Sequence, residues 1–311
     1  GYYGARLQQA GCEVHFLLRS DYDRVNQQGL RVDSVDGDFT LPQVDAYNDP
    51  AQMPPIDVVI VALKGTVNDR LPSLMPPLAT NAIVLTLQNG LDIEAGIAAW
   101  FDPDRIWGGL CFICANKIAP GHIHHLDYSK IVLGAYSPTR QRQPITPTMR
   151  AIAADFERAG IPIQLTDDLL MARWRKLVWN VPYNGLSVVL DAQTNEMMAD
   201  PDLRSLIATL MTEVVTVANA WGDKLSQVIG AEPGDRHLPA DLIADMLTHT
   251  DEMRPYRTSM KLDYDDGRPL EVETILGNPV RSAAAIGVSV PHMAMLYQQV
   301  KFLDQRLTSR A

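Results

Sequence analysis

The sequence predicts an α/β protein with a doubly wound sheet in its first half and only helices in its second half. Two observations carry this prediction. Short apolar strands alternate with amphipathic helices up to residue 166, and only helical patterns follow from residue 167 to the end. We therefore expect two domains, residues 1–166 and residues 167–311. The length of 311 residues agrees, since a domain takes roughly 150 residues.

The first domain has three strand segments, and helical patterns fill the gaps between and around them. The strands are expected at residues 12–18 (CEVHFLL), 57–63 (DVVIVAL) and 82–87 (AIVLTL), and the helices at residues 1–10, 21–29, 67–76 and 92–100. The last two strands are continuous apolar runs, which is typical of parallel strands that helices cover on both faces. This alternation predicts a sheet of the Rossmann type.

Extended segments continue the first domain at residues 105–115, 121–126 and 130–134. Gly, Pro-Gly and Asp-Tyr-Ser punctuate them, so we expect an antiparallel extension of the sheet. A polar loop at residues 137–149 then leads to a helix at about residues 149–159 and a strand at residues 162–165.

Composition excludes several classes of protein. Hydrophobic residues make up 46% and charged residues 21%, which is ordinary globular composition. The formal charge of −10 argues against a nucleic-acid partner, because an acidic chain gains nothing from counterion release on a phosphate backbone. No apolar run approaches the ~20 residues that span a bilayer. No leader pattern opens the sequence, and three cysteines make no disulfide framework, so we expect a cytoplasmic protein.

A helix with small residues followed by a strand that ends near Arg19 is typical of the middle of a dinucleotide-binding βαβ unit. An acidic residue after that strand would bind a ribose 2′-hydroxyl, whereas an arginine would pair with a 2′-phosphate. Arg19 therefore favours NADP, and Asp21 leaves NAD open. A solvated surface arginine is the alternative.

Polar residues also end two further strands. Lys64 follows the run at residues 57–63, and Asn89 and Gly90 follow the run at residues 82–87. Ligands of open α/β sheets collect outside the carboxyl ends of strands, so we expect Lys64 and Asn89 to reach one crevice.

The helix after residue 167 carries Lys176, Asn180 and Asn184 at a spacing of four, which puts them on one face. Its other positions are mostly apolar, apart from Arg173 and Arg175. Buried polar groups need partners, and a ligand with several oxygens would supply them. The alternative is that neighbouring backbone groups, and no ligand, supply the hydrogen-bond partners of this polar row.

Glu271 follows Pro269 closely and is expected in the first turn of a helix that runs to about residue 285. A carboxylate there is also explained by the helix dipole alone. Ser259 lies on another helix. Cys111 and Cys114 form a CxxC, but within an extended segment instead of at a helix N-terminus, so we expect neither a redox motif nor a metal site.

Together these segments resemble the ketopantoate reductase (2-dehydropantoate 2-reductase) family across essentially the whole chain. The matching stretches are GYYGARLQQAGCEVHFLLR, DVVIVALK, LTLQNGLD, RWRKLVWNVPYNGL, TSMKLDYDDGRPLEVE and GVSVPH. The resemblance implies a Rossmann domain, an all-helical domain and NADPH in the cleft between them.

The resemblance also implies roles for the residues that match the family's motifs. Lys176 is similar to the family's general acid, and Glu271 to its second essential group, at substrate and cofactor. The remaining matches are Asn180, Asn184 and Ser259 as substrate-binding residues, and Arg19, Lys64 and Asn89 as cofactor contacts.

Three departures from the family pattern stand out. The GxGxxG fingerprint would lie before Gly1, so we expect a longer chain that contains it. Asn184-Gly185-Leu186 stands where the family has Asn-Pro-Leu, and Leu270-Glu271-Val272-Glu273 where it has Thr-Glu-Ile-Asp. We expect the last two departures near the substrate, so they bear on its identity.

The resemblance predicts NADPH-dependent reduction of a 2-oxo acid, foremost ketopantoate to pantoate on the route to pantothenate and coenzyme A. The alternatives are a reductase of another branched 2-oxo acid and a non-catalytic dinucleotide-sensing protein. The expected partner is the small-molecule substrate. The oligomeric state is not given by the sequence, and a homodimer is left open.

Overall fold

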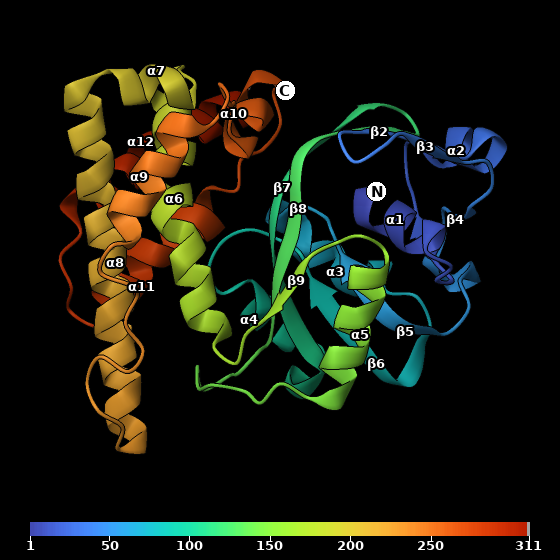
Figure 1. Ribbon diagram of the computed structural model, residues 1–311, viewed down its shortest axis with the longest axis horizontal. Helices are drawn as coiled ribbons and strands as arrows, with labels where there is room; N and C mark the ends of the chain where they lie inside the picture. Colours follow the sequence, from blue (N-terminus) through green and yellow to red (C-terminus); the bar gives the residue numbers. More distant parts are fainter. Residues whose placement is uncertain (310–311) are drawn as a thin grey trace.

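Two lobes make up the computed structural model, which describes residues 1–309 (Figure 1). An N-terminal lobe contains all the strands of the described chain, and a C-terminal lobe contains only helices. This arrangement confirms the predicted fold class of an α/β sheet domain followed by a helical domain.

The main sheet has seven strands in the order β3-β2-β8-β7-β6-β5, with β9 also paired to β8. Its strands are β2 (Leu30–Ser34), β3 (Phe39–Leu41), β5 (Ile56–Val61), β6 (Leu78–Thr86), β7 (Ile106–Ala119), β8 (His122–Ala135) and β9 (Ile163–Leu165). β5, β6 and β7 run parallel, whereas β7 and β8 form a long antiparallel hairpin. β8 is parallel to both β2 and β9, so the sheet is mixed.

The strand expected at residues 12–18 forms as β1 (His15–Leu17), but it lies outside the main sheet. It pairs in parallel with β4 (Asp45–Tyr47) in a separate two-stranded sheet. β5 is an edge strand of the main sheet. The expectation that β1 belongs to the same sheet as the other strands is therefore wrong for this structure, because its backbone bonds go to β4 instead.

Helices flank the strands of this lobe as the alternating pattern predicts. They are α1 (Tyr2–Gln9), α2 (Tyr22–Gln28), α3 (Leu71–Leu74), α4 (Ile93–Ala98) and α5 (Pro147–Arg158). The two segments expected at residues 121–126 and 130–134 are one strand, β8. Tyr128 occupies the left-handed region between them, with φ 54°, and the strand continues through it.

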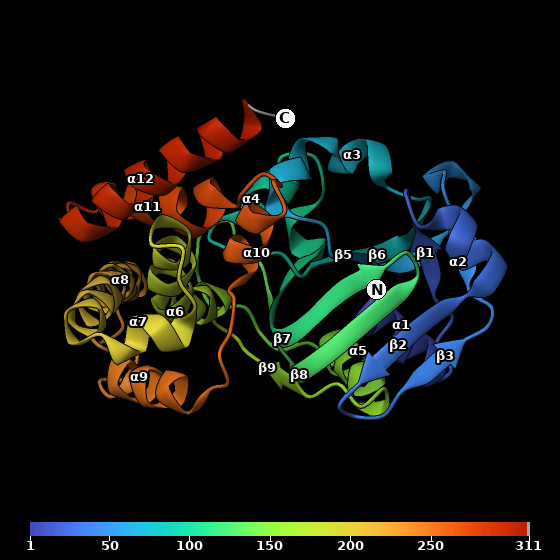
Figure 2. The ribbon, with the colours of Figure 1, turned by 90° about the horizontal axis from the view of Figure 1, so that it is seen from above.

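The helical lobe is built around α6 (Leu169–Val189), which packs against α8, α10 and α12 (Figure 2). The other elements are α7 (Thr194–Ala199), α8 (Pro201–Ile229), α9 (Leu242–Glu252), α10 (Ser259–Asp265), a π-helical turn at Glu273–Gly277, α11 (Asn278–Ala284) and α12 (Pro291–Thr308). Trp174 and Tyr183 of α6 are fully buried in its core. Within residues 1–309, none of the helices has the length and apolarity needed to cross a membrane.

The start of α6 is fixed by Asp168, whose carboxylate accepts a hydrogen bond from the Met171 backbone N–H. The same carboxylate forms a buried ion pair with Arg236, at 2.6 Å. These two contacts set where the first turn begins, and hence which side chains of α6 face the sheet. Lys176 lies two turns further along.

Candidate active site

Lys176 connects the two lobes. Its ammonium donates hydrogen bonds to the Asn89 amide oxygen at 2.7 Å and to the Cys111 carbonyl oxygen at 2.6 Å. Asn89 follows β6, and Cys111 belongs to β7, so α6 meets the sheet where β6 ends. The Phe112 ring lies 5.3 Å from the Lys176 nitrogen and contributes an apolar side to this position.

Burial lowers the pKa of Lys176 to about 8, because the ammonium loses most of its hydration there. Smaller effects are included in this value: the charges of Cys111 and Glu271 raise the pKa of Lys176, and the nearby Arg173 guanidinium lowers it. A lysine with such a pKa is partly neutral near physiological pH, so it exchanges protons more readily than an ordinary lysine.

A second group of charges lies at the carboxyl end of β5. Glu271 accepts a hydrogen bond from the Gly65 backbone N–H at 3.0 Å, and its other oxygen lies 3.5 Å from the Lys64 ammonium. Lys64 also pairs with Asp263 at 2.7 Å. Both carboxylate side chains are only 3% exposed, whereas the Lys64 side chain is 43% exposed. Two buried acids of the helical lobe therefore hold one lysine of the sheet lobe.

Glu271 precedes the helix that was expected to contain it. The helical conformation begins at Val272, and the Glu271 carbonyl accepts the bond from Ile275 N–H. Its carboxylate is directed to the other lobe, at Gly65 and Lys64. The simple explanation by a helix dipole therefore does not account for its contacts.

The other two expected site residues of α6, Asn180 and Asn184, lie in different surroundings. Asn180 is buried and lines a small recess together with Lys176, Gly90 and Leu110. Asn184 lies one turn further on, where its amide oxygen accepts hydrogen bonds from the Met260 backbone N–H at 3.2 Å and from Ser259 at 3.4 Å. Asn184 and Ser259 thus join α6 to the start of α10.

Arg19 is exposed just after β1, and the structure brings it to none of the other expected site residues. Among the described residues its guanidinium takes part in no side-chain hydrogen bond or ion pair. Asp21, which left NAD open, pairs with Lys117 at 2.8 Å and accepts a bond from Gly121 N–H. That carboxylate is already engaged by the β7–β8 hairpin.

The two departures in the helical lobe do not face this site. A Cβ at Gly185 would come within 2.6 Å of the Leu296 side chain, so this position serves the close packing of α6 on α12. Glu273 is half exposed, accepts a hydrogen bond from the Tyr297 hydroxyl and pairs with Arg281 and Lys301. The expectation that these departures lie near the substrate is not supported by their contacts.

Two residues of the site were missed from the sequence. Asp263, the partner of Lys64, has no pattern that marks it among the acids of its segment. The only sequence signal for Arg173 is that it is a charged residue on an otherwise apolar helix. No group of three or more His, Cys, Asp or Glu side chains within residues 1–309 is arranged to hold a metal ion.

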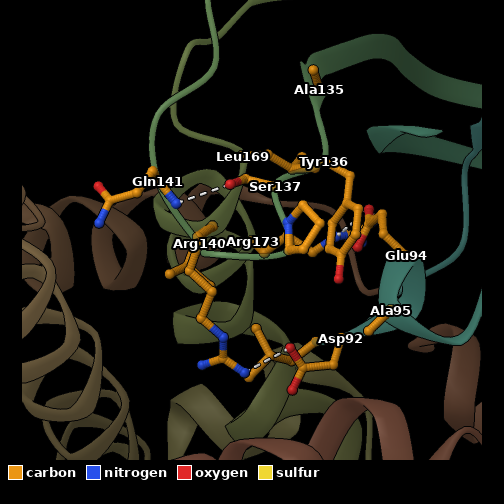
Figure 3. A pocket seen from close by; sticks show the side chains of 13 residues that line it. Asp92, Glu94, Ala95, Ala135, Tyr136, Ser137, Arg140, Gln141, Leu169 and Arg173 are labelled. Atoms are coloured by element: carbon orange, nitrogen blue, oxygen red, sulfur yellow. Dashed lines mark hydrogen bonds and ion pairs between the residues drawn. The ribbon is translucent and has the colours of Figure 1, made fainter. Parts of the chain in front are cut away.

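A cavity of about 340 Å³ lies beside this site, between α4, the start of α6 and the segment after β8 (Figure 3). Asp92 pairs with Arg140 along its wall at 3.0 Å, and Glu94 and Arg173 reach it from α4 and α6. Burial raises the pKa of Asp92. None of the expected site residues lines this cavity.

The fold and the site define a two-domain α/β oxidoreductase, with Lys176 at the junction between a nucleotide-binding type of sheet and a helical domain. Comparison with known proteins agrees. Residues 1–138 match the family model described as ketopantoate reductase PanE/ApbA, and residues 168–304 match the model of its C-terminal part.

Relatives extend the match over nearly the whole chain. A 2-dehydropantoate 2-reductase of Nostoc sp. is 55% identical over 307 residues, covering 98% of this chain and 92% of that protein. The crystal structure of 2-dehydropantoate 2-reductase from Geobacter metallireducens is 40% identical with a TM-score of 0.88, over 96% of this chain and 95% of that one. The corresponding structure from Methylococcus capsulatus is 32% identical with a TM-score of 0.85, over 98% and 94%. The chain belongs to the ketopantoate reductase PanE/ApbA family.

Proposed function

We propose that this protein reduces 2-dehydropantoate (ketopantoate) to pantoate with NADPH, in pantothenate and coenzyme A biosynthesis. The observation that carries the proposal is the Lys176 ammonium, held between Asn89 and the Cys111 carbonyl where the two lobes meet. The 55% identity to a 2-dehydropantoate 2-reductase over nearly the full length supports the choice of substrate. The division into a cofactor domain, residues 1–166, and a catalytic domain, residues 167–311, belongs to the same proposal.

The residues present fit a nicotinamide dinucleotide with a 2′-phosphate. Arg19 is an exposed guanidinium after β1, where a 2′-phosphate would find a charge-assisted partner. Lys64 and Asn89 offer an ammonium and an amide beyond the carboxyl ends of β5 and β6. When bound, NADPH supplies a hydride from C4 of its nicotinamide to the ketone carbon of the substrate.

Lys176 contributes both charge and a proton to this reaction. As the ketone carbon is reduced, its oxygen gains negative charge, which the ammonium stabilises. The same ammonium then transfers a proton to that oxygen, giving the 2-hydroxy acid and a neutral amine that solvent reprotonates. Asn89 and the Cys111 carbonyl hold the ammonium in place by their hydrogen bonds.

The other polar groups of the site bind and orient the substrate in this proposal. Asn180 shares the recess of Lys176, and Asn184 with Ser259 continues the polar row along α6. Glu271 holds Lys64 and the Gly65 backbone, so that the two lobes keep a near-attack arrangement.

The lowered pKa of Lys176 predicts the pH dependence of turnover. Because the ammonium is the acid, kcat/KM for ketopantoate is expected to fall as the pH rises through about 8, instead of near the ordinary lysine value of 10.5. Steady-state kcat/KM at saturating NADPH between pH 6 and 10.5 measures this alkaline fall of activity. A kcat/KM that stays level up to pH 10 would contradict the role of Lys176 as the acid.

Arg19 predicts the cofactor preference. Arg19→Ala is expected to weaken NADPH binding by about 10- to 150-fold, because a charge-assisted contact contributes about 1.5–3 kcal/mol. NADH, which lacks the 2′-phosphate, should bind with unchanged affinity. Fluorescence titration with both cofactors measures the two Kd values, with Arg24→Ala, an exposed arginine on α2, as the control. Equal losses for both cofactors would make Arg19 structural.

Two other functions are distinguished by simple measurements. A reductase of another branched 2-oxo acid keeps the same chemistry, and kcat/KM across a small panel of 2-oxo acids identifies the preferred substrate. A dinucleotide-sensing protein would bind NADPH and turn over none of the panel. The pairing of Lys176 and Glu271 with groups of the sheet lobe favours an enzyme.

A further inference from the structure

Arg173 lies one turn before Lys176 on α6, and its side chain is only 3% exposed. One end of its guanidinium donates hydrogen bonds to the carbonyl oxygens of Gln88 at 2.8 Å and Gly90 at 3.2 Å. These two carbonyls flank Asn89, whose amide oxygen accepts the hydrogen bond from Lys176. Arg173 therefore holds the backbone on both sides of the residue that orients the proposed acid.

Glu94 fixes the other side of the guanidinium. Its carboxylate accepts a hydrogen bond from the Arg173 Nε at 3.0 Å and another from the adjacent nitrogen, and its own side chain is 4% exposed. A Cβ at Gly108 of β7 would lie 2.2 Å from this carboxylate, so the glycine leaves the space that the pair occupies. The Arg173–Glu94 pair is thus built into the contact between α4, α6 and β7.

The segment that Arg173 holds is also fixed from the opposite side. Gly90 has φ 107°, and a Cβ there would come within 2.5 Å of Thr274. The Leu91 backbone N–H donates to the Thr274 carbonyl at 2.8 Å. Asn89 therefore lies in a backbone turn held between α6 on one side and the turn that follows Glu271 on the other.

A buried ion pair is weak evidence for stability, since the loss of hydration offsets much of the attraction between the charges. The stability of the fold therefore does not explain why a charged pair lies here. The hydrogen bonds from Arg173 to the carbonyls on either side of Asn89 do explain it. The two carbonyl acceptors beside Asn89 would otherwise need other donors.

We infer that Arg173, held by Glu94, is a positioning residue that sets the place of Asn89 and, through it, the direction of the Lys176 ammonium. This inference rests on the proposed function, in which Lys176 is the acid. Arg173 acts through Asn89, by its hydrogen bonds to the carbonyl oxygens on either side of that residue. Its positive charge also lowers the pKa of Lys176, so charge and geometry are separable by substitution.

Two variants separate these effects. Arg173→Lys keeps the charge but loses the planar group that reaches both carbonyls and the carboxylate. We expect kcat to fall by about 10- to 100-fold, the effect of a misplaced reacting group, with little change in the pH at which activity falls on the alkaline side. The double variant Arg173→Met/Glu94→Gln removes both charges without leaving either unpaired. It should show a similar fall in kcat. In addition, the pKa of Lys176 should rise because the Arg173 charge is gone, so that activity falls only at a higher pH.

The melting temperature and the folded fraction are measured for each variant, and Arg175→Lys, an exposed change on the same helix, is the control. The inference is supported when Arg173→Lys lowers kcat per folded molecule by a larger factor than it changes the KM for the 2-oxo acid. A kcat per folded molecule equal to that of the unmodified protein would overturn it.

The pKa of Lys176 itself gives a measurement independent of turnover. Labelling of Lys176 by dinitrofluorobenzene as a function of pH, followed by mass spectrometry, reports this pKa in the cofactor-free protein. An upward shift in the Arg173→Met/Glu94→Gln variant supports the inference, and an unchanged labelling curve overturns it. If the unmodified protein reduces no 2-oxo acid, the proposed function fails, and the labelling curve still decides whether Arg173 acts on Lys176.

Discussion

Lys176→Ala is expected to lower kcat for ketopantoate reduction by roughly 10²–10⁴, the usual contribution of a positioned general acid. The alanine removes both the proton and the positive charge that stabilises the developing alkoxide. The Kd for NADPH should be nearly unchanged, because in this mechanism Lys176 meets the carbonyl oxygen of the substrate and not the dinucleotide. Steady-state kinetics and a fluorescence titration with NADPH measure both quantities.

Lys176→Gln should restore little of this activity, since an amide donates a hydrogen bond but no readily transferred proton. Arg175→Ala, an exposed change one position away, is the control and should leave kcat unaltered. The melting temperature of each variant distinguishes catalysis from packing. A Lys176→Ala protein that melts early but turns over normally per folded molecule would remove the catalytic role.

Glu271→Gln is expected to lower kcat/KM by about 10- to 150-fold, since a hydrogen bond to a charged group contributes about 1.5–3 kcal/mol. The glutamine keeps an acceptor for the Gly65 N–H but loses the negative charge opposite Lys64. The negative charge of Glu271 raises the pKa of Lys176. Its removal in Glu271→Gln should therefore lower the pKa of Lys176, so that activity falls at a lower pH than in the unmodified protein.

Glu273→Gln is a matched control for this variant, since Glu273 lies two residues away and faces solvent. It should change kcat/KM by less than twofold, because its partners Tyr297, Arg281 and Lys301 all belong to the helical lobe. Equal effects of the two substitutions would show that Glu271 acts only on the stability of this segment.

The sequence by itself determined only part of the strands of the first lobe, since β2, β3 and β4 lie between residues 30 and 47, where no strand is expected. The runs at residues 57–63 and 82–87 are continuous and apolar, and they appear as β5 and β6. The expected burial is confirmed for the second half of β6 but is wrong for β5, which is an edge strand and mostly only partly buried. The spacing of Lys176, Asn180 and Asn184 likewise determined that they share a face of α6, because helical periodicity is local. Lys64 and Asn89 could be expected at one edge because parallel strands end together.

Tertiary structure alone decided which side chains of different segments meet. Nothing local pairs Arg173 with Glu94 or Lys64 with Asp263, since 79 and 199 positions separate the partners along the chain. The sequence also does not predict the position of β1, because the residues of an apolar strand do not determine which strand it pairs with. The same holds for Gly185 and Glu273, which the sequence puts beside site residues. Side chains that are adjacent in the chain point in different directions from a helix, so neighbours of Asn184 and Glu271 face the core and the solvent instead of the site.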